Sequence, residues 1–364
     1  MSGSVRARLG AALLGTMLWS ACRREPARPP PGRHAPAARL DRRVELPDVA
    51  DAAQRARLAD TSAALVYAHR LRFERGRPVR GAPTLGQAKQ LCPGERFADQ
   101  PSWAFCSGTL VDRDLVLTAG HCLGPDPARA AERCRRTRLV FGYHLTEGGG
   151  LADPRAEEVY ACRRVTILRQ DPGGAGADYA ILQLDRPVER RHPAHVARGP
   201  VEIGERLEAA GYGAGLPLKI EAATVLAAPA SDLSTDSNAF AGASGGGLYD
   251  SAGELVAFHL RGAVDWRFDR RCTRAETTPG GDDRAQLAAP AVDALCEAGW
   301  PSPALCGTAE RHGCAGDCRS PRCGDGLCEA AEWATCQADC LPYPDVPAAW
   351  PDDPETYRRA NAQR

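Results

Sequence analysis

The feature that most restricts how this chain of 364 residues can fold is its set of fifteen cysteines. So many thiols would be a liability in a reducing cytosol, whereas outside the cytosol they cross-link the chain. Zinc binding is the other common use of cysteine, and it usually requires Cys-x-x-Cys pairs or Cys/His clusters. The sequence contains no Cys-x-x-Cys. We therefore expect an exported, disulfide-bonded protein and no metal site.

The amino-terminal segment also indicates export. Basic residues precede an apolar run from Leu9 to Trp19, which is too short to span a bilayer. Small residues then precede Cys22, and this segment resembles the lipobox of bacterial lipoproteins, although Trp19 stands where that pattern prefers Leu. We expect residues 1–22 to be a signal peptide. Cys22 is then either the lipidated first residue of the mature chain or an ordinary cysteine of the signal peptide, so the protein is lipid-anchored at the cell envelope or secreted.

The rest of the chain divides by composition. Residues 23–61 are rich in Pro, Ala and Arg, which predicts an extended tether. Residues 62–297 contain short apolar runs separated by Gly, Pro and Asp, and this texture predicts an all-β fold. A helical pattern over residues 285–295 predicts a closing helix. Residues 306–340 hold seven cysteines and predict a small disulfide-rich module, and residues 341–364 predict a disordered tail.

Charge excludes one class of partner. The chain has 46 basic and 46 acidic residues, whereas nucleic-acid-binding proteins usually carry a basic excess. No segment after the amino-terminal run is long and apolar enough to cross a membrane, so we expect membrane contact only through a lipid on Cys22. We expect no cofactor.

Three local motifs carry the chemistry. They lie at residues 106–122, 178–184 and 242–246, and their sequences include CSGTLV and LTAGHC, DYAILQL, and GASGG. In this order they resemble the trypsin-like (chymotrypsin-fold) serine peptidases, and the resemblance extends over about residues 62–296. It implies two packed antiparallel six-stranded barrels and a protein or peptide substrate.

The resemblance implies His121, Asp178 and Ser244 as a catalytic triad. A serine hydroxyl is a poor nucleophile and needs a neighbouring base, and an imidazole can accept its proton. A carboxylate at Asp178 would fix the tautomer of His121 and stabilise the imidazolium. The glycines around Ser244 would let the N–H groups of Gly242 and Ser244 converge on the oxyanion of the intermediate.

The cysteines suggest three pairs in this region. Cys106 and Cys122 match the family's disulfide between the strand before the histidine and the histidine turn. Cys134 and Cys162 flank a predicted strand–loop–strand stretch and form our second expected pair. Elimination leaves Cys92 with Cys272.

Departures from trypsin itself bear on activation and specificity. Ala243 stands where trypsin has the Asp that pairs with a newly formed amino terminus, so activation by that salt bridge is not expected. This change, and the texture of residues 242–262, resemble the bacterial glutamyl-endopeptidase-like branch. Asn238 replaces the Asp that recognises Lys or Arg, and His259 matches a histidine that binds the substrate carboxylate in that branch.

The predicted specificity is therefore a preference for Glu or Asp before the scissile bond. Arg261 lies two residues after His259 and would face the same side of an extended strand. The alternative is that His259 is a strand histidine satisfied by a backbone carbonyl group.

The carboxy-terminal cysteines leave two readings open. The sequence CGDGLC at residues 323–328 resembles short Cys-Gly-Asp-Gly-x-Cys repeats of bacterial exported proteins. The acidic residues of this module could surround calcium, or the module could be a disulfide staple with surface acids, and its partner cannot be inferred from the sequence. Two functional alternatives to a peptidase are a catalytically idle trypsin-fold binding protein and a surface adhesion protein that uses the cysteine-rich module.

Overall fold

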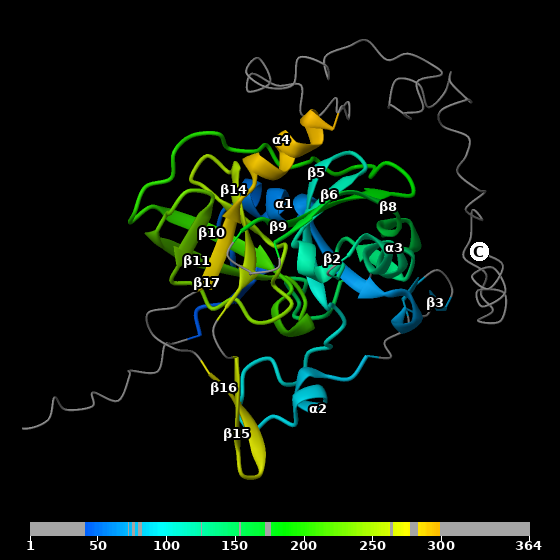
Figure 1. Cartoon of the computed structure of the whole chain (residues 1–364). Helices are drawn as coiled ribbons and strands as arrows, with labels where there is room; N and C mark the ends of the chain where they lie inside the picture. The colour runs from blue at the N-terminus through cyan, green and yellow to red at the C-terminus, as the bar shows by residue number, and fades with distance from the viewer. Residues whose placement is uncertain are drawn as a thin grey trace, which may run out of the picture. The chain divides into compact units, whose positions relative to one another are not determined.

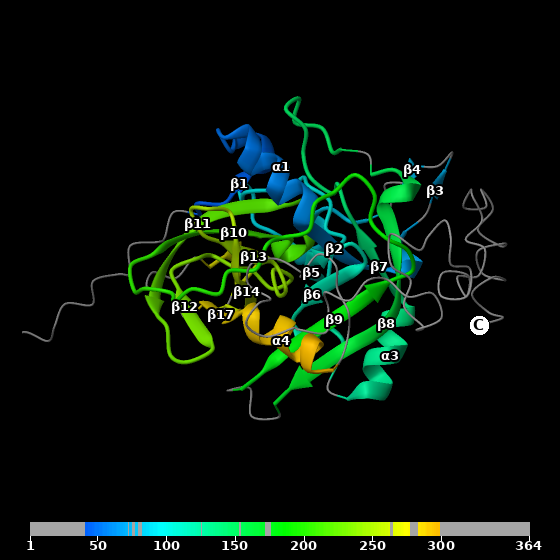
Figure 2. The same cartoon turned by 90° about the horizontal axis from the view of Figure 1, so that it is seen from above.

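The strands of the first half of the chain close into an antiparallel barrel, seen at the right of Figure 2. The computed structural model describes residues 41–298, except 72, 75–76, 79–81, 125, 153, 172–175, 263–264 and 277–282. Around the barrel the order of strands is β2 (Ser62–Tyr67), β5 (Cys106–Asp112), β6 (Leu115–Thr118), β9 (Asp178–Leu184), β8 (Val159–Gln170) and β7 (Thr137–Val140).

A second ring of six strands follows in sequence. Its order is β10 (Arg206–Gly211), β11 (Lys219–Ala227), β12 (Asp232–Thr235), β17 (Asp283–Leu287), β14 (Leu255–Arg261) and β13 (Gly247–Tyr249). The ring closes because β12 pairs with both β11 and β17, and because β13 pairs with β10. The predicted fold of two six-stranded barrels is therefore confirmed.

Four helices and several short elements surround the barrels (Figure 1). The helices are α1 (Ala52–Thr61), α2 (Leu85–Lys89), α3 (Pro127–Arg135) and α4 (Ala289–Glu297). The 3₁₀ turns are η1 (Leu46–Asp48), η2 (Ala68–Arg70), η3 (Gly120–Cys122), η4 (Ala156–Glu158) and η5 (Gly213–Gly215). Two small hairpins pair β3 (Phe73–Glu74) with β4 (Arg77–Pro78), and β15 (Trp266–Asp269) with β16 (Cys272–Ala275). None of the helices in the described part of the chain could span a bilayer.

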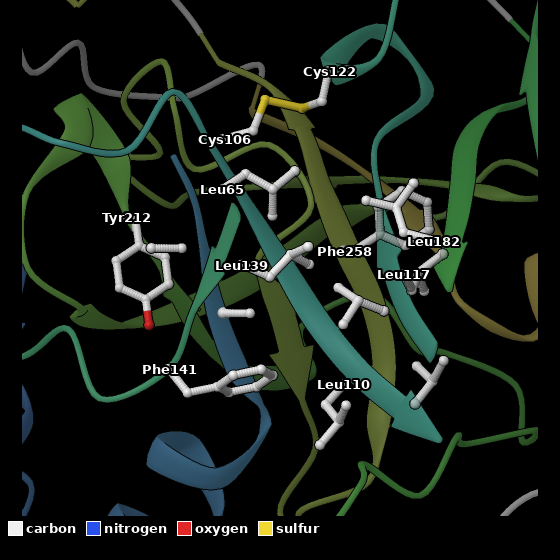
Figure 3. Close-up of a cluster of buried hydrophobic side chains, with 14 of the residues drawn as sticks. Leu65, Cys106, Leu110, Leu117, Cys122, Leu139, Phe141, Leu182, Tyr212 and Phe258 are labelled. Atoms are coloured by element: carbon white, nitrogen blue, oxygen red, sulfur yellow. A yellow bond between two sulfur atoms is a disulfide. The ribbon is translucent and has the colours of Figure 1, made fainter. Parts of the chain in front are cut away.

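Apolar strand residues fill the interior of the first barrel and its boundary with the second. Leu65, Leu110, Leu117 and Leu139 are fully buried, and Figure 3 shows their side chains within one apolar cluster. Phe258 of the second barrel belongs to the same buried cluster. A core shared in this way holds the two barrels together, because removing apolar surface from water contributes ~25 cal/mol per Å².

The folded region begins earlier than the sequence suggested. Residues 44–61, assigned to the tether, form β1 (Val44–Glu45), η1 and α1. They fold onto the barrels because Leu46, Val49 and Leu58 are buried in the core and β1 pairs with β11. Asp51 caps α1 by accepting hydrogen bonds from two backbone N–H groups of its first turn.

The carboxy-terminal end of this region also differs from the prediction. The helical pattern was expected over residues 285–295, but residues 283–287 form β17 and α4 begins at Ala289. Pairing with both β12 and β14 holds β17 in the strand conformation, and a sequence pattern does not reveal such pairing. The predicted signal peptide with Cys22, the cysteine-rich module at 306–340 and the tail at 341–364 lie outside the described residues.

Candidate active site

His121 and Asp178 come together at one end of the first barrel. His121 lies in η3 directly after β6, and Asp178 begins β9, which pairs with β6. The Oδ2 atom of Asp178 is 2.7 Å from Nδ1 of His121, and its Oδ1 atom accepts the backbone N–H of His121 at 2.8 Å. Two contacts to one carboxylate fix both the ring and the backbone of the histidine.

The electrostatics of this pair select one tautomer. Burial alone would raise the pKa of Asp178, but the hydrogen bond from His121 and the nearby charges of His121 and Arg261 outweigh burial and lower that pKa. An ionised carboxylate only accepts hydrogen bonds, so Nδ1 of His121 carries the proton and Nε2 is left as an acceptor. This is the form of imidazole that a general base requires.

Gly120 makes the close approach of the two segments possible. A Cβ atom at this position would lie 2.7 Å from the carbonyl oxygen of Arg169 and 2.9 Å from Oδ1 of Asp178. Any side chain there would push the histidine turn away from β8 and β9. The backbone of Asp178 is held from the second barrel, where the side chain of Gln286 accepts its N–H at 3.0 Å.

Ser244 lies in the turn between β12 and β13 of the second barrel. Gly242 has φ of +103° and Gly245 has φ of +88°, a region that favours glycine. The N–H groups of Ala243 and Gly245 donate to the carbonyl groups of Phe240 and His259. Within the described residues, the N–H groups of Gly242 and Ser244 have no acceptor, which leaves both able to bind an oxyanion.

Strand β5 of the first barrel holds this turn. The backbone N–H of Ser107 donates to the carbonyl oxygen of Ser244 at 2.8 Å, and its hydroxyl donates to the carbonyl oxygen of Gly242 at 2.8 Å. Thr109 donates to the carbonyl oxygen of Gly245 at 3.2 Å. The Ser244 hydroxyl itself donates to the carbonyl oxygen of Leu260 at 2.9 Å. Among the described residues no hydrogen bond joins Ser244 to His121. His121 and Asp178 thus belong to the first barrel and Ser244 to the second, and β5 links the two.

Three disulfides join the pairs that the sequence suggested. Cys106 of β5 is bonded to Cys122 of η3, so the strand that holds Ser244 is covalently tied to the histidine turn. Cys134 is bonded to Cys162 and fastens α3 to β8. The third bond joins Cys92 to Cys272 and connects the segment after α2 with the hairpin β15–β16.

Asn238 is buried and turned toward a carboxylate. Its backbone N–H and its side-chain amide both donate to Glu221, each at 2.8 Å. Glu221 is buried in β11, where burial raises its pKa against the hydrogen bonds from Asn238 and the charge of Arg42. The neutral residue predicted at the base of the substrate site therefore has an acidic partner that the sequence did not indicate.

His259 and Arg261 have different environments. His259 is buried in β14, with Nδ1 lacking a partner among the described residues, and burial lowers its pKa to about 4. Arg261 is exposed, and its charge helps to lower the pKa of Asp178. A bulge between the two residues interrupts the regular alternation on which their common orientation was predicted.

Comparisons with known proteins agree with this fold. Residues 106–258 match the family model described as a trypsin-like peptidase domain. Snake venom serine protease 3 of Protobothrops jerdonii is 27% identical over 125 residues, which cover 32% of this chain and 42% of that protein. Granzyme B of Homo sapiens is also 27% identical over 125 residues, covering 33% and 45% of the two chains. This chain thus spans less than half the length of these curated relatives.

A solved structure described as a Glu endopeptidase in complex with MPD is similar over 66% of this chain and 93% of its own, at 14% identity and a TM-score of 0.42. Residues 106–258 are thus similar in sequence to a trypsin-like peptidase domain, and the strands of the described region form two six-stranded barrels.

Proposed function

We propose that this protein is a serine endopeptidase that hydrolyses peptide bonds through an acyl-enzyme formed on Ser244. The observation that carries the proposal is the 2.7 Å contact between Nδ1 of His121 and Oδ2 of Asp178. It leaves Nε2 of the histidine as a proton acceptor, and β5 and its disulfide tie the histidine turn to the turn that carries Ser244.

The reaction would begin when the Ser244 hydroxyl exchanges its hydrogen bond to Leu260 for one to Nε2 of His121. Oγ then attacks the substrate carbonyl carbon as its proton passes to His121, and the N–H groups of Gly242 and Ser244 receive the oxyanion. His121 returns the proton to the leaving amine, and water repeats the sequence on the ester. Asp178 remains ionised throughout and stabilises the imidazolium.

Hydrolysis of denatured casein tests this function directly. We expect cleavage by the full chain and a loss of at least ~10³-fold in Ser244→Ala and in His121→Ala, because each removes a member of the triad. Ser251→Ala, at an exposed serine in the turn between β13 and β14, is the matched control and should keep wild-type activity. A full chain that folds but cleaves nothing would favour the catalytically idle binding protein or the adhesion protein instead.

The residue preference is a finer proposal, and it keeps Glu or Asp before the scissile bond. His259 supports it because a buried imidazole whose Nδ1 lacks a partner is poorly solvated, and a substrate carboxylate would stabilise its charged form. The exposed guanidinium of Arg261 adds positive charge beside Asp178.

A buried carboxylate on the neighbouring strand favours the opposite preference, so basic substrates belong in the test. Asp283 of β17 accepts hydrogen bonds from Ser237 and from the backbone of Ala239. Its Oδ1 lies 2.6 Å from where a Cβ atom on Gly262 would be.

We expect a series of peptides that differ only at the residue before the scissile bond to be cleaved fastest after Glu. His259→Ala should reduce that cleavage more than Val225→Ala, a core change elsewhere in the second barrel. Cleavage after Arg or Lys alone would contradict the acidic preference.

We also propose that the protein acts outside the cytoplasm, either anchored through lipid on Cys22 or secreted. The proposal rests on the amino-terminal sequence and on the three disulfides of the domain, which persist in oxidising compartments.

A further inference from the structure

The segment Asp41–Glu45 lies against the loop that leads to Ser244. Residues 236–243 form this loop, and it begins where β12 ends. Ala243 has no carboxylate that could receive a new amino terminus. The loop therefore needs another source of order, and its contacts with the amino-terminal segment supply one.

Arg42 contacts the start of the loop. Its Nε lies 3.2 Å from Oε1 of Glu221, its Nη1 lies 3.2 Å from Oδ2 of Asp236, and its Nη2 donates to the backbone carbonyl of Asp236 at 2.8 Å. Glu221 in turn accepts both N–H groups of Asn238. One guanidinium thus fixes the loop directly at residue 236 and, through Glu221, at residue 238.

Arg43 contacts the middle of the loop. Its guanidinium lies 3.8 Å from the ring centroid of Phe240, and Asp41 binds it through two hydrogen bonds of 2.9 and 2.8 Å. Arg43 is only 5% exposed. Its Nη1 is buried without a hydrogen-bond partner among the described residues, so burial of this cation is costly and the stack on Phe240 is part of its compensation.

Phe240 connects Arg43 to the turn that carries Gly242 and Ser244. Its carbonyl oxygen accepts the N–H of Ala243 at 2.8 Å, which closes the turn that carries the N–H groups of Gly242 and Ser244. The segment itself is anchored elsewhere, because β1 pairs with β11 and Glu45 forms an ion pair with Lys219 at 3.0 Å. A fixed support therefore extends from β11 through Arg43 to the turn.

We propose that Arg42 and Arg43 are positioning residues that hold the 236–243 loop in its competent conformation from within the chain, in place of a newly formed amino terminus. This inference rests on the proposed peptidase function. Neither arginine touches the reacting atoms. Each acts through the loop, so its loss should lower the rate of the chemical step more than it weakens substrate binding.

The test compares Arg42→Met and Arg43→Met with wild type in the full chain, by the rate of labelling with a fluorophosphonate and by kcat and KM for a peptide substrate. We expect labelling and kcat to fall by ~10- to 10²-fold, since a displacement of about 1 Å can have that effect. KM should change little. Arg42→Lys should recover part of the loss, because an ammonium keeps the charge facing Glu221 and Asp236.

Two comparisons separate positioning from general destabilisation. Arg198→Met removes an arginine that pairs with Asp293 at 2.6 Å and, within the described part of the chain, forms no hydrogen bond or ion pair with the loop, so it should label at the wild-type rate. Asp236→Asn removes a charge that binds Arg42, so its effect should combine non-additively with that of Arg42→Met. Folding of every variant is checked by urea unfolding.

Labelling of folded Arg42→Met and Arg43→Met within about twofold of wild type would overturn the inference while leaving the peptidase function intact. If Arg42→Met fails to fold, Asp236→Asn carries the same test, because it removes a charge that binds Arg42. If Arg43→Met fails to fold, Phe240→Leu does so, because it removes the ring against which the Arg43 guanidinium lies. A wild-type chain that is neither labelled nor active would instead refute the peptidase function, so the two failures are distinguishable.

Discussion

Asp178 has a role that a single substitution can isolate. In Asp178→Asn, the amide can donate to Nδ1 of His121 and favour the tautomer that carries its proton on Nε2, which cannot accept from Ser244. We expect kcat to fall by ~10⁴-fold with little change in fold, as loss of the orienting carboxylate does in serine peptidases. Asp114→Asn is the matched control, because Asp114 is a carboxylate of the same barrel that accepts a hydrogen bond from Gln183. Equal losses in the two variants would contradict the assigned role.

His259 should make stability depend on pH. Burial lowers its pKa to about 4 in the folded protein, from 6.5 for an ordinary histidine. The unfolded chain therefore binds a proton that the folded chain refuses. As pH falls from about 6.5 toward 4, the free energy of unfolding should drop by up to about 3 kcal/mol. Urea unfolding across this range checks the slope, which should flatten in His259→Gln and persist in His195→Gln, a change at an exposed histidine. An unchanged slope in His259→Gln would show that the pKa of His259 does not differ between the folded and the unfolded chain.

The histidine turn depends on one glycine. A methyl group in Gly120→Ala would collide with backbone atoms of β8 and with the carboxylate of Asp178. We expect the turn to move outward and fluorophosphonate labelling to slow by ~10²-fold. Gly199→Ala places its methyl group in open space and should change nothing. Wild-type labelling by folded Gly120→Ala would mean that the close approach of the two segments is not required.

The disulfides should differ in their effects on activity. Replacing both cysteines of Cys106–Cys122, or both of Cys134–Cys162, by serine should lower the free energy of unfolding by ~3 kcal/mol, as expected for closed loops of 16 and 28 residues. Only loss of Cys106–Cys122 should also slow labelling, because that bond ties the histidine turn to β5, which holds Ser244. Urea unfolding and labelling of both double variants check this difference, and equal labelling would contradict it.

Local motifs and global contacts differ in how far the sequence reveals them. The segments around His121 and Ser244 are short and chemically distinctive, so the sequence predicted the type of site and the two barrels. Residues 44–61 were assigned to the tether because a strand of two residues has no periodicity and because α1 is ordered by its contacts with the barrels. Glu221 and the two arginines that contact the Ser244 loop were missed for the same reason, since their partners lie up to 194 positions away in the sequence.

Across the full chain, Cys22 should determine where the protein is found. If Cys22 carries diacylglycerol, the protein should partition into detergent, and Cys22→Ser should move it to the aqueous phase, because acyl chains bind membranes through buried CH₂ groups at ~0.8 kcal/mol each. Phase partitioning of the two exported proteins measures this. Identical partitioning would favour simple secretion.

The most direct test of the peptidase assignment is to locate the site of covalent reaction with a serine-directed fluorophosphonate by peptide mapping. The pairing of His121 with Asp178 should activate one serine among all those in the chain. We expect a single adduct on Ser244, formed by the wild-type protein and absent from both Ser244→Ala and His121→Ala. An adduct on another serine, or labelling that survives in Ser244→Ala, would contradict it.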